Sequence, residues 1–183
     1  MPAPATPVAA YAGVGSRQTP PEVLAEMERI GRRLAKAGWL LRSGAADGAD
    51  AAFERGCMAV PGPREIYLPW TGFQNRTPQE PGVLLVPAAI QAEAERIAAE
   101  AHPAWRWLKF GEKKLHTRNV CQVLGPDLQS PCRVVICYTT QGRGQGGTGQ
   151  AIRVARASGV SMIDLGTPGL DLEAELAAVL QVA

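Results

Sequence analysis

The sequence predicts an α/β protein with a Rossmann-like, doubly wound and mostly parallel sheet that carries helices on both faces. Two observations support this prediction. Short runs that are apolar throughout alternate with helical patterns, which is typical of strands buried on both faces. Two of these runs, residues 8–12 and 133–138, are followed by glycine-rich turns that lead into helices. We expect these two strands to flank the point where the strand order reverses, since ligands bind there in such sheets.

The first half of the chain predicts three strands and two helices. A helix opens at Pro20 and Pro21, with a proline in its first turn, and is stopped by Gly38. One face of this helix is apolar, because hydrophobic side chains recur at steps of three and four residues: Leu24, Met27, Ile30, Leu34 and Ala37. The second helix and the three strands are expected at residues 50–58 and at 8–12, 39–42 and 64–68.

The second half predicts a helical insert followed by the rest of the sheet. Prolines and glycines over residues 71–87 indicate a loop, and helical patterns follow within an insert at about 71–130. The predicted helices are 88–102, 112–124, 151–158 and 172–180, and the predicted strands are 133–138 and 160–165. We therefore expect a single domain over residues 1–183.

Composition excludes several classes of protein. Of the 183 residues 46% are hydrophobic and 20% are charged, which excludes a disordered or collagen-like chain. A formal charge of +2 excludes a histone-like polyanion binder but not a local basic groove. No apolar run approaches the roughly 20 residues that a bilayer crossing needs. The first seven residues contain three prolines, predict a short extended lead-in, and do not resemble a secretory signal.

Cysteine and histidine spacing gives no metal-site pattern. The four cysteines form no C-x-x-C pair, and the two histidines fit no zinc spacing. We therefore expect reduced structural thiols in a cytoplasmic protein, no metal site, no resident cofactor and no membrane partner.

The turn after the first predicted strand has the features of an anion site. Gly13 and Gly15 lack the Cβ that would block a close backbone approach, so N–H groups can face an anion. Ser16 adds a hydroxyl donor, and Arg17 adds a guanidinium suited to phosphate oxygens. The alternative is a tight strand–helix turn with Arg17 in solvent.

The loop after residues 133–138 is the stronger candidate for binding phosphate. It lies between a strand and a helix, so its amides and the helix dipole converge, and Thr148 adds a hydroxyl. The site residues expected here are Gly146, Gly147, Thr148 and Gly149. A flexible linker is the alternative. A dinucleotide fingerprint is disfavoured, because only 34 residues follow Gly149.

A third small-residue turn mixes glycine with carboxylates. Ser43 and Gly44 begin it, and Asp47 is placed to accept ribose hydroxyls or a base amino group, because a carboxylate would repel phosphate. Helix capping is the alternative for Asp47 and the favoured role for Asp50.

These three turns, in this order, resemble those of the SLOG superfamily of Rossmann-like proteins. The resemblance rests on residues Tyr11 to Arg17, Ser43 to Asp50, and Gly146 to Gly149. Within the superfamily, the sequence most resembles small DprA-like proteins of phages and prophages. The resemblance implies a site for a nucleotide, a nucleotide-derived ligand or a nucleic-acid backbone, and it allows a homodimer. It also implies that Arg118 and Asn119 reach the glycine loops from the insert.

One departure bears on catalysis. The LONELY GUY phosphoribohydrolases of this superfamily carry a glutamate shortly after their glycine-threonine motif, whereas Gln150, Ala151 and Ile152 stand here. Nucleoside monophosphate hydrolysis would therefore need Asp47 or Glu112 as its carboxylate. No catalytic residue is assigned.

The insert also interleaves aromatic and basic side chains between His102 and Asn119. Aromatic rings that stack bases, beside cations that hold phosphates, are typical of single-strand binding. The alternative is a helix pair with Trp105, Leu108 and Leu115 in its core. Two hypotheses follow: binding or sensing of a soluble nucleotide-derived ligand, which the near-neutral charge favours, and DprA-like single-stranded DNA binding.

Overall fold

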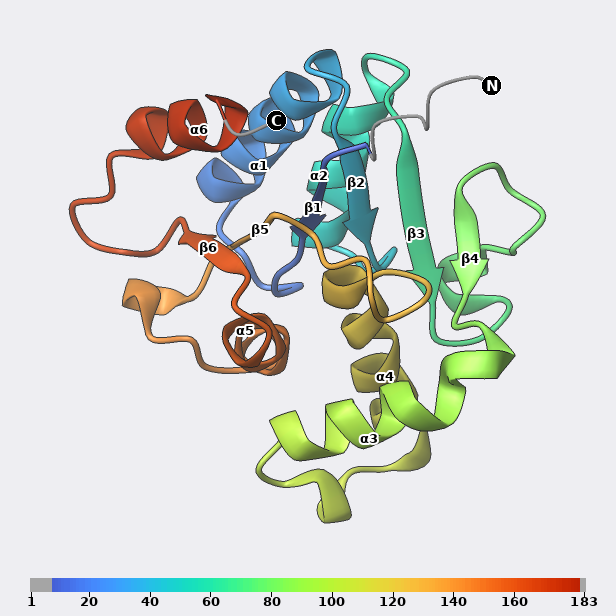
Figure 1. Cartoon of the computed structure of the whole chain (residues 1–183). Coiled ribbons are helices and arrows are strands. Elements are labelled where there is room, and N and C mark those ends of the chain that lie inside the picture. The colour runs from blue at the N-terminus through green and yellow to red at the C-terminus, as the bar shows by residue number, and fades with distance from the viewer. Residues whose placement is uncertain (1–7, 182–183) are drawn as a thin grey trace.

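A six-stranded parallel sheet forms the centre of the computed structural model, which describes residues 8–181 (Figure 1). The predicted lead-in of residues 1–7 lies outside this range. The strand order is β4-β3-β2-β1-β5-β6, and every neighbouring pair is parallel. The strands are β1 (Ala10–Gly13), β2 (Leu40–Ser43), β3 (Arg64–Leu68), β4 (Val83–Leu85), β5 (Val134–Cys137) and β6 (Ser161–Asp164).

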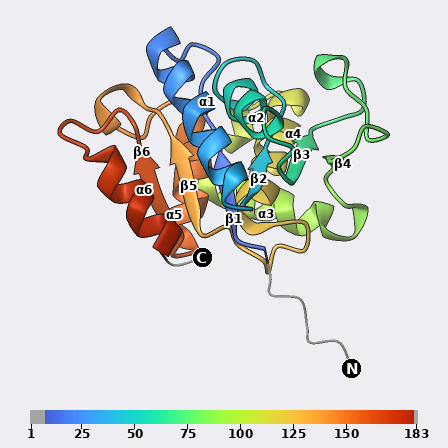
Figure 2. The same cartoon turned by 90° about the horizontal axis from the view of Figure 1, so that it is seen from above.

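Helices cover both faces of this sheet, which confirms the doubly wound α/β fold (Figures 1 and 2). One core holds side chains of α1 (Pro21–Lys36), α2 (Ala49–Met58) and α6 (Leu172–Gln181) against the sheet. The other core holds those of α3 (Gln91–Ala101), α4 (Phe110–Leu124) and α5 (Thr148–Ala157). Within residues 8–181 no helix combines the length and apolarity that crossing a bilayer requires.

The strand order reverses between β1 and β5. Tyr11 of β1 pairs with Leu41 of β2 on one side and with Val134 of β5 on the other. The chain leaves β1 for α1 on one face and leaves β5 for α5 on the opposite face. The loops that follow these two strands therefore diverge and leave a crevice at the carboxyl edge of the sheet, as the sequence predicts.

The structure differs from the sequence prediction in three places that bear on the sheet edge and the cavity. The prediction of a loop over residues 71–87 was wrong at β4. This three-residue strand lies between Gly82 and Val86 at the edge of the described sheet and pairs with β3. Its short length hides the strand pattern among the surrounding glycines and prolines. The helix α4 begins two residues earlier than expected, at Phe110, and α5 begins at Thr148, inside the predicted loop.

Candidate ligand-binding site

A cavity of about 400 Å³ lies in the crevice between the loops that follow β1 and β5. Its walls come from the β1–α1 loop, the start of α2, one face of α4 and the start of α5. The residues that line it are Val14, Gly15, Ser16, Arg17, Gln18, Ala46, Asp50, Glu112, Leu115, His116, Arg118, Asn119, Gln122, Gly147, Thr148 and Ala151.

The β1–α1 loop presents Ser16 and Arg17 to this cavity, both with exposed side chains. The Ser16 hydroxyl accepts the Gln18 N–H at 3.0 Å, so its own proton is available to a ligand. Within the described chain, the main-chain N–H groups of Ser16 and Arg17 donate to no carbonyl or side chain. The loop therefore offers a hydroxyl, a guanidinium and two amides.

Gly13 and Gly15 serve packing in this loop. A Cβ on Gly13 would lie 2.6 Å from the Phe53 ring, and one on Gly15 would lie 2.5 Å from the Ala49 Cβ. Both glycines thus let the loop pack closely on α2. Gly13 is buried and does not line the cavity, whereas Gly15 does.

The β5–α5 loop contributes Gly147 to the cavity, whereas the predicted site residue Gly146 does not line it. No atom lies within 4 Å of a Cβ built on Gly146 or on Gly147. The main-chain N–H groups of residues 145–148 find no acceptor within residues 8–181, and the buried Thr148 lines the cavity at the start of α5. Gly149, in contrast, packs against the chain, since its Cβ would lie 2.4 Å from the Gly144 carbonyl oxygen. The positive end of the α5 dipole adds to the attraction for an anion.

Asp164, at the end of β6, holds this loop in place. Its carboxylate accepts the N–H groups of Thr139 and Gly166 at 2.8 and 3.0 Å, and also the Thr139 hydroxyl. The same hydroxyl accepts the Gly144 N–H at 2.9 Å. Asp164 thus ties the start of the β5–α5 loop to the end of β6.

A buried ion pair forms the floor of the cavity. Arg118 of α4 and Asp50 of α2 are 4% and 3% exposed, and Nη1 lies 3.4 Å from Oδ2. Burial raises the pKa of Asp50, and Arg118 opposes this rise. Burial also lowers the pKa of Arg118, but an arginine stays protonated in proteins. The Arg118 Nε is itself buried and has no acceptor among the described residues.

Gly44 makes room for this floor. A Cβ on Gly44 would lie 1.5 Å from the Arg118 Nη1 and 2.3 Å from the Gln122 amide. In the orientation that satisfies its neighbours, the Gln122 side-chain oxygen accepts the Gly44 N–H at 2.8 Å and an Arg118 N–H. Gly44 therefore seats a protein guanidinium, and it does not line the cavity.

The insert reaches the glycine loops through α4. Asn119 and Arg118 both line the cavity, and the Asn119 amide donates to the Gln150 side-chain oxygen at 3.2 Å. Glu112 lines it as well, and its carboxylate accepts the Lys109 N–H at 2.6 Å at the start of α4. Of the two carboxylates considered for hydrolysis, only Glu112 borders the cavity.

Two residues of the β2–α2 turn lie outside the cavity. The buried Ser43 hydroxyl donates to the Gly13 carbonyl at 2.7 Å, and the exposed Asp47 carboxylate accepts from the Gln74 amide at 2.9 Å. Asp50 lies in the first turn of α2, as expected, but the prediction that its side chain caps this helix was wrong. Gly48 is the N-cap residue of α2 and no side chain caps this helix, since the Asp50 carboxylate accepts from the Ala46 N–H and from Arg118.

Sequence reasoning missed three lining residues of α4: Leu115, His116 and Gln122. The signal that could have found them is helical spacing, because Glu112, Leu115 and Asn119 share one face with them. Burial, followed by the neighbouring His102, lowers the pKa of His116 to about 4, so this ring is neutral near pH 7. Its buried Nδ1 has no partner in the described chain.

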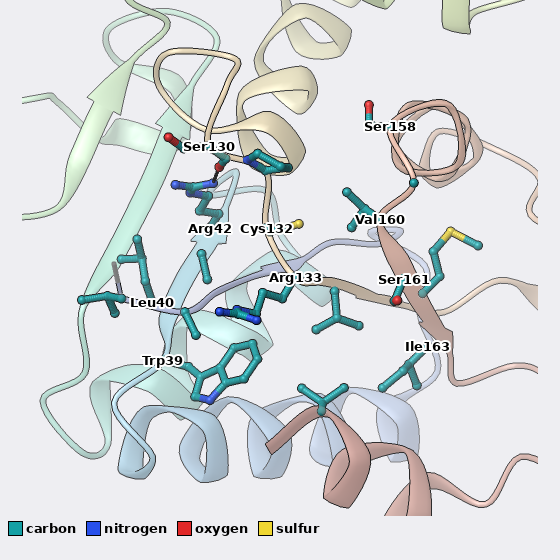
Figure 3. Close-up of a pocket in the computed structure, with 18 of the residues that line it drawn as sticks. Trp39, Leu40, Arg42, Ser130, Cys132, Arg133, Ser158, Val160, Ser161 and Ile163 are labelled. Carbon is teal, nitrogen blue, oxygen red and sulfur yellow. Dashed lines mark hydrogen bonds between the residues drawn. The ribbon is translucent and has the colours of Figure 1, made fainter. Parts of the chain in front are cut away.

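A larger cavity of about 930 Å³ lies at the opposite, amino edge of the sheet (Figure 3). Trp39, Leu40, Val160 and Ile163 give it largely apolar walls. Its buried cation, Arg42, is already neutralised by Glu65 at 2.8 Å and donates to the Ser130 carbonyl. We therefore favour the smaller cavity, which lies where doubly wound sheets bind ligands and where N–H donors are free.

Thiols and metal ligands are not gathered at either cavity. All four cysteines are buried, and burial raises the pKa of Cys121 and of Cys132 to about 12, so both stay protonated and are poor nucleophiles. Within residues 8–181, no group of three or more His, Cys, Asp and Glu side chains is placed to hold a metal ion.

No protein-family model matches the sequence, and no curated protein matches it. Solved structures do match. The molybdenum cofactor carrier protein of Chlamydomonas reinhardtii superposes with a TM-score of 0.59 at 14% identity, over 95% of this chain and 98% of that one.

Two bacterial structures of DNA processing protein A (DprA) also match. The Helicobacter pylori protein, described for its single-stranded DNA binding mode, has a TM-score of 0.51 and 16% identity over 96% of this chain and 74% of that one. The Streptococcus pneumoniae protein has a TM-score of 0.53 and 19% identity over 96% of this chain and 57% of that one. At these identities the likeness concerns the fold. The chain thus shares the Rossmann-like fold of these structures, which confirms the fold that the resemblance of its three turns implies.

Proposed function

We propose that this chain binds a nucleotide or a nucleotide-derived phosphate ligand in the cavity between β1 and β5. The observation that supports this proposal is the convergence of free N–H donors on one cavity. These donors are the amides of Ser16 and Arg17, the amides of Gly147 and Thr148, and the guanidinium of Arg118, all on residues that line the cavity.

The charges around the cavity favour a phosphate group. Arg17 is cationic, and α5 directs the positive end of its dipole to the same place. The Asp50 charge is balanced by Arg118, which leaves Glu112 at the wall as the carboxylate able to accept from ligand hydroxyl or amino groups. A volume of about 400 Å³ falls within the range of small-molecule sites.

Calorimetric titration with AMP, cyclic AMP, ADP-ribose and inorganic phosphate tests this proposal. We expect at least one compound to bind, and Arg17→Ala to weaken its binding roughly tenfold or more, because a charge-assisted hydrogen bond is lost. Arg143→Ala is the matched control, since Arg143 is an exposed arginine of the β5–α5 loop that does not line the cavity. Absence of binding for all four compounds, or equal losses in the two variants, would refute the proposal.

A second candidate function, single-stranded nucleic acid binding, is favoured by a different observation. Trp107 and Phe110 are 75% and 76% exposed, and each ring has a cation above it. The Arg106 Cζ lies 4.7 Å from the Trp107 ring centroid, and the Lys114 Nζ lies 4.6 Å from that of Phe110. In contrast, Trp105 and Leu115 are partly buried against the two cores, so the insert combines packing with an aromatic, basic surface. For such binding, the logarithm of the binding constant falls linearly as the logarithm of the salt concentration rises.

A further inference from the structure

A groove outside the ligand cavity lies between the carboxyl ends of β3 and β4 and the helices α3 and α4. Its volume is about 460 Å³. We call it the Trp70–Phe110 groove and define it by the side chains that the argument uses: Trp70, Leu85, Glu95, Phe110, Lys113 and Lys114.

Exposed apolar surface is concentrated in this groove. Six large apolar side chains are exposed within residues 8–181, and three of them line it: Trp70 (37%), Leu85 (38%) and Phe110 (76%). Soluble proteins rarely leave several such side chains together without a binding role.

The Trp70 ring is held in position. It packs edge-on against the buried Phe73 ring, with 5.3 Å between the centroids. On its other side it lies beside the first turn of α4, where a Cβ on Gly111 would be 3.8 Å from the ring. Trp70 therefore needs little ordering on binding, and it lies beside the turn of α4 that carries Phe110.

Basic groups outnumber acidic ones in the groove. Lys113 and Lys114 line it together with one carboxylate, Glu95. Lys114 lies over the Phe110 ring, and Lys113 lies 5.6 Å from the Trp105 ring centroid. A partner with flat aromatic groups and regularly spaced negative charges complements this surface better than an apolar helix or an acidic peptide does.

The helix α4 separates the groove from the ligand cavity. Phe110, Lys113, Lys114 and Thr117 face the groove, at steps of three and four residues. Glu112, Leu115, His116 and Asn119 face the cavity at the same spacing. The two sites are therefore adjacent, on opposite sides of the first turns of one helix.

We infer that the Trp70–Phe110 groove binds unpaired bases of a single-stranded nucleic acid, with Lys113 and Lys114 on its phosphates. This inference rests on the second candidate function, single-strand binding, and assigns the residues that hold the strand. It does not depend on a mononucleotide binding in the cavity.

Fluorescence anisotropy with a labelled strand of twelve thymidines tests the inference. Trp70→Ala and Phe110→Ala are each expected to weaken binding roughly 5- to 150-fold, the range measured when a stacking residue is truncated. Lys113→Ala combined with Lys114→Ala is expected to make the salt dependence shallower by about 1.4 in the log–log slope, since each single-strand phosphate contact contributes about 0.7.

Met58→Ala is the control, because Met58 is an exposed large apolar residue (53%) at the end of α2 that does not line the groove. Phe110→Ala should leave the fold intact, because this side chain is 76% exposed. A loss of binding in this variant therefore does not come from misfolding. If the natural sequence binds the strand while Trp70→Ala and Phe110→Ala bind it as well as Met58→Ala does, the groove assignment is overturned and single-strand binding stands. If the natural sequence does not bind at all, both are overturned. If Trp70→Ala and Phe110→Ala lose a dimer that the natural sequence forms but keep its affinity for the strand, the inference is also overturned. The groove would then be a protein interface.

Discussion

Substitution of Gly44 by alanine tests whether the buried pair forms the floor of the cavity. The added methyl group would lie 1.5 Å from the Arg118 Nη1 and 2.0 Å from its Cζ, so the guanidinium must leave its place. Asp50, 3% exposed, would then lose its cationic partner. Breaking a buried ion pair in this way costs about 3–5 kcal/mol. For a chain of this size, each kcal/mol lowers the Tm by roughly 2–4 °C, so we expect a fall of roughly 6–20 °C.

Differential scanning calorimetry of Gly44→Ala measures this fall, with Gly147→Ala as its control. Gly147 has φ and ψ of −60° and −34°, and its Cβ would meet no atom within 4 Å. Alanine fits there without strain, so the Tm should stay the same or rise slightly. Gly44→Ala should also cost less when Asp50→Asn and Arg118→Ala are already present, because the displaced charge is gone. A Gly44→Ala protein that melts within about 2 °C of the natural sequence would show that the floor is not built as described.

Three further predictions concern the surroundings of the site. Burial and His102 hold the His116 pKa at about 4, so the unfolded chain binds more protons between that pH and roughly 6.5. The Tm, followed by scanning fluorimetry, should therefore fall as the pH drops through this window. It should fall less in His116→Gln, and parallel curves of Tm against pH for the two proteins would contradict this. Asp164→Asn should lower the free energy of unfolding in urea by about 1–3 kcal/mol, because the Thr139 hydroxyl and its loop lose an acceptor, and an unchanged midpoint would argue against that role. Leu176→Ala should lower the free energy of unfolding by about 2–5 kcal/mol in the same assay, because it leaves a cavity where this fully buried side chain of α6 packs. A loss under about 1 kcal/mol would mean that α6 adds little to the core.

The arrangement of the sheet could be predicted from the sequence because it depends on local patterns. Residues 133–138 and 8–12 are apolar runs that end in glycine-rich turns, and these two features identify β5 and β1 as the strands at the reversal. The edge strand β4 escaped prediction because three residues are too few to show a period.

The roles of individual site residues could not be predicted in the same way. A glycine in a turn signals close approach, but the approaching group can be a ligand or the protein itself. At Gly44 it is the Arg118 guanidinium, and at Gly13 it is the Phe53 ring. The partner of Asp50 is 68 residues away in the chain, so a local pattern suggests a helix cap where the fold makes an ion pair.

The pairing of β1 with β5 has a consequence for how the protein acquires its site. Tyr11 pairs with Val134, so most of the polypeptide must be synthesised before the two strands can meet. Contacts between such distant segments form late and slowly, because a long loop must close first. The crevice between the loops after β1 and β5 is then absent from any shorter folding intermediate, and a molecule that bridges its two sides would retard unfolding and proteolysis of the finished protein.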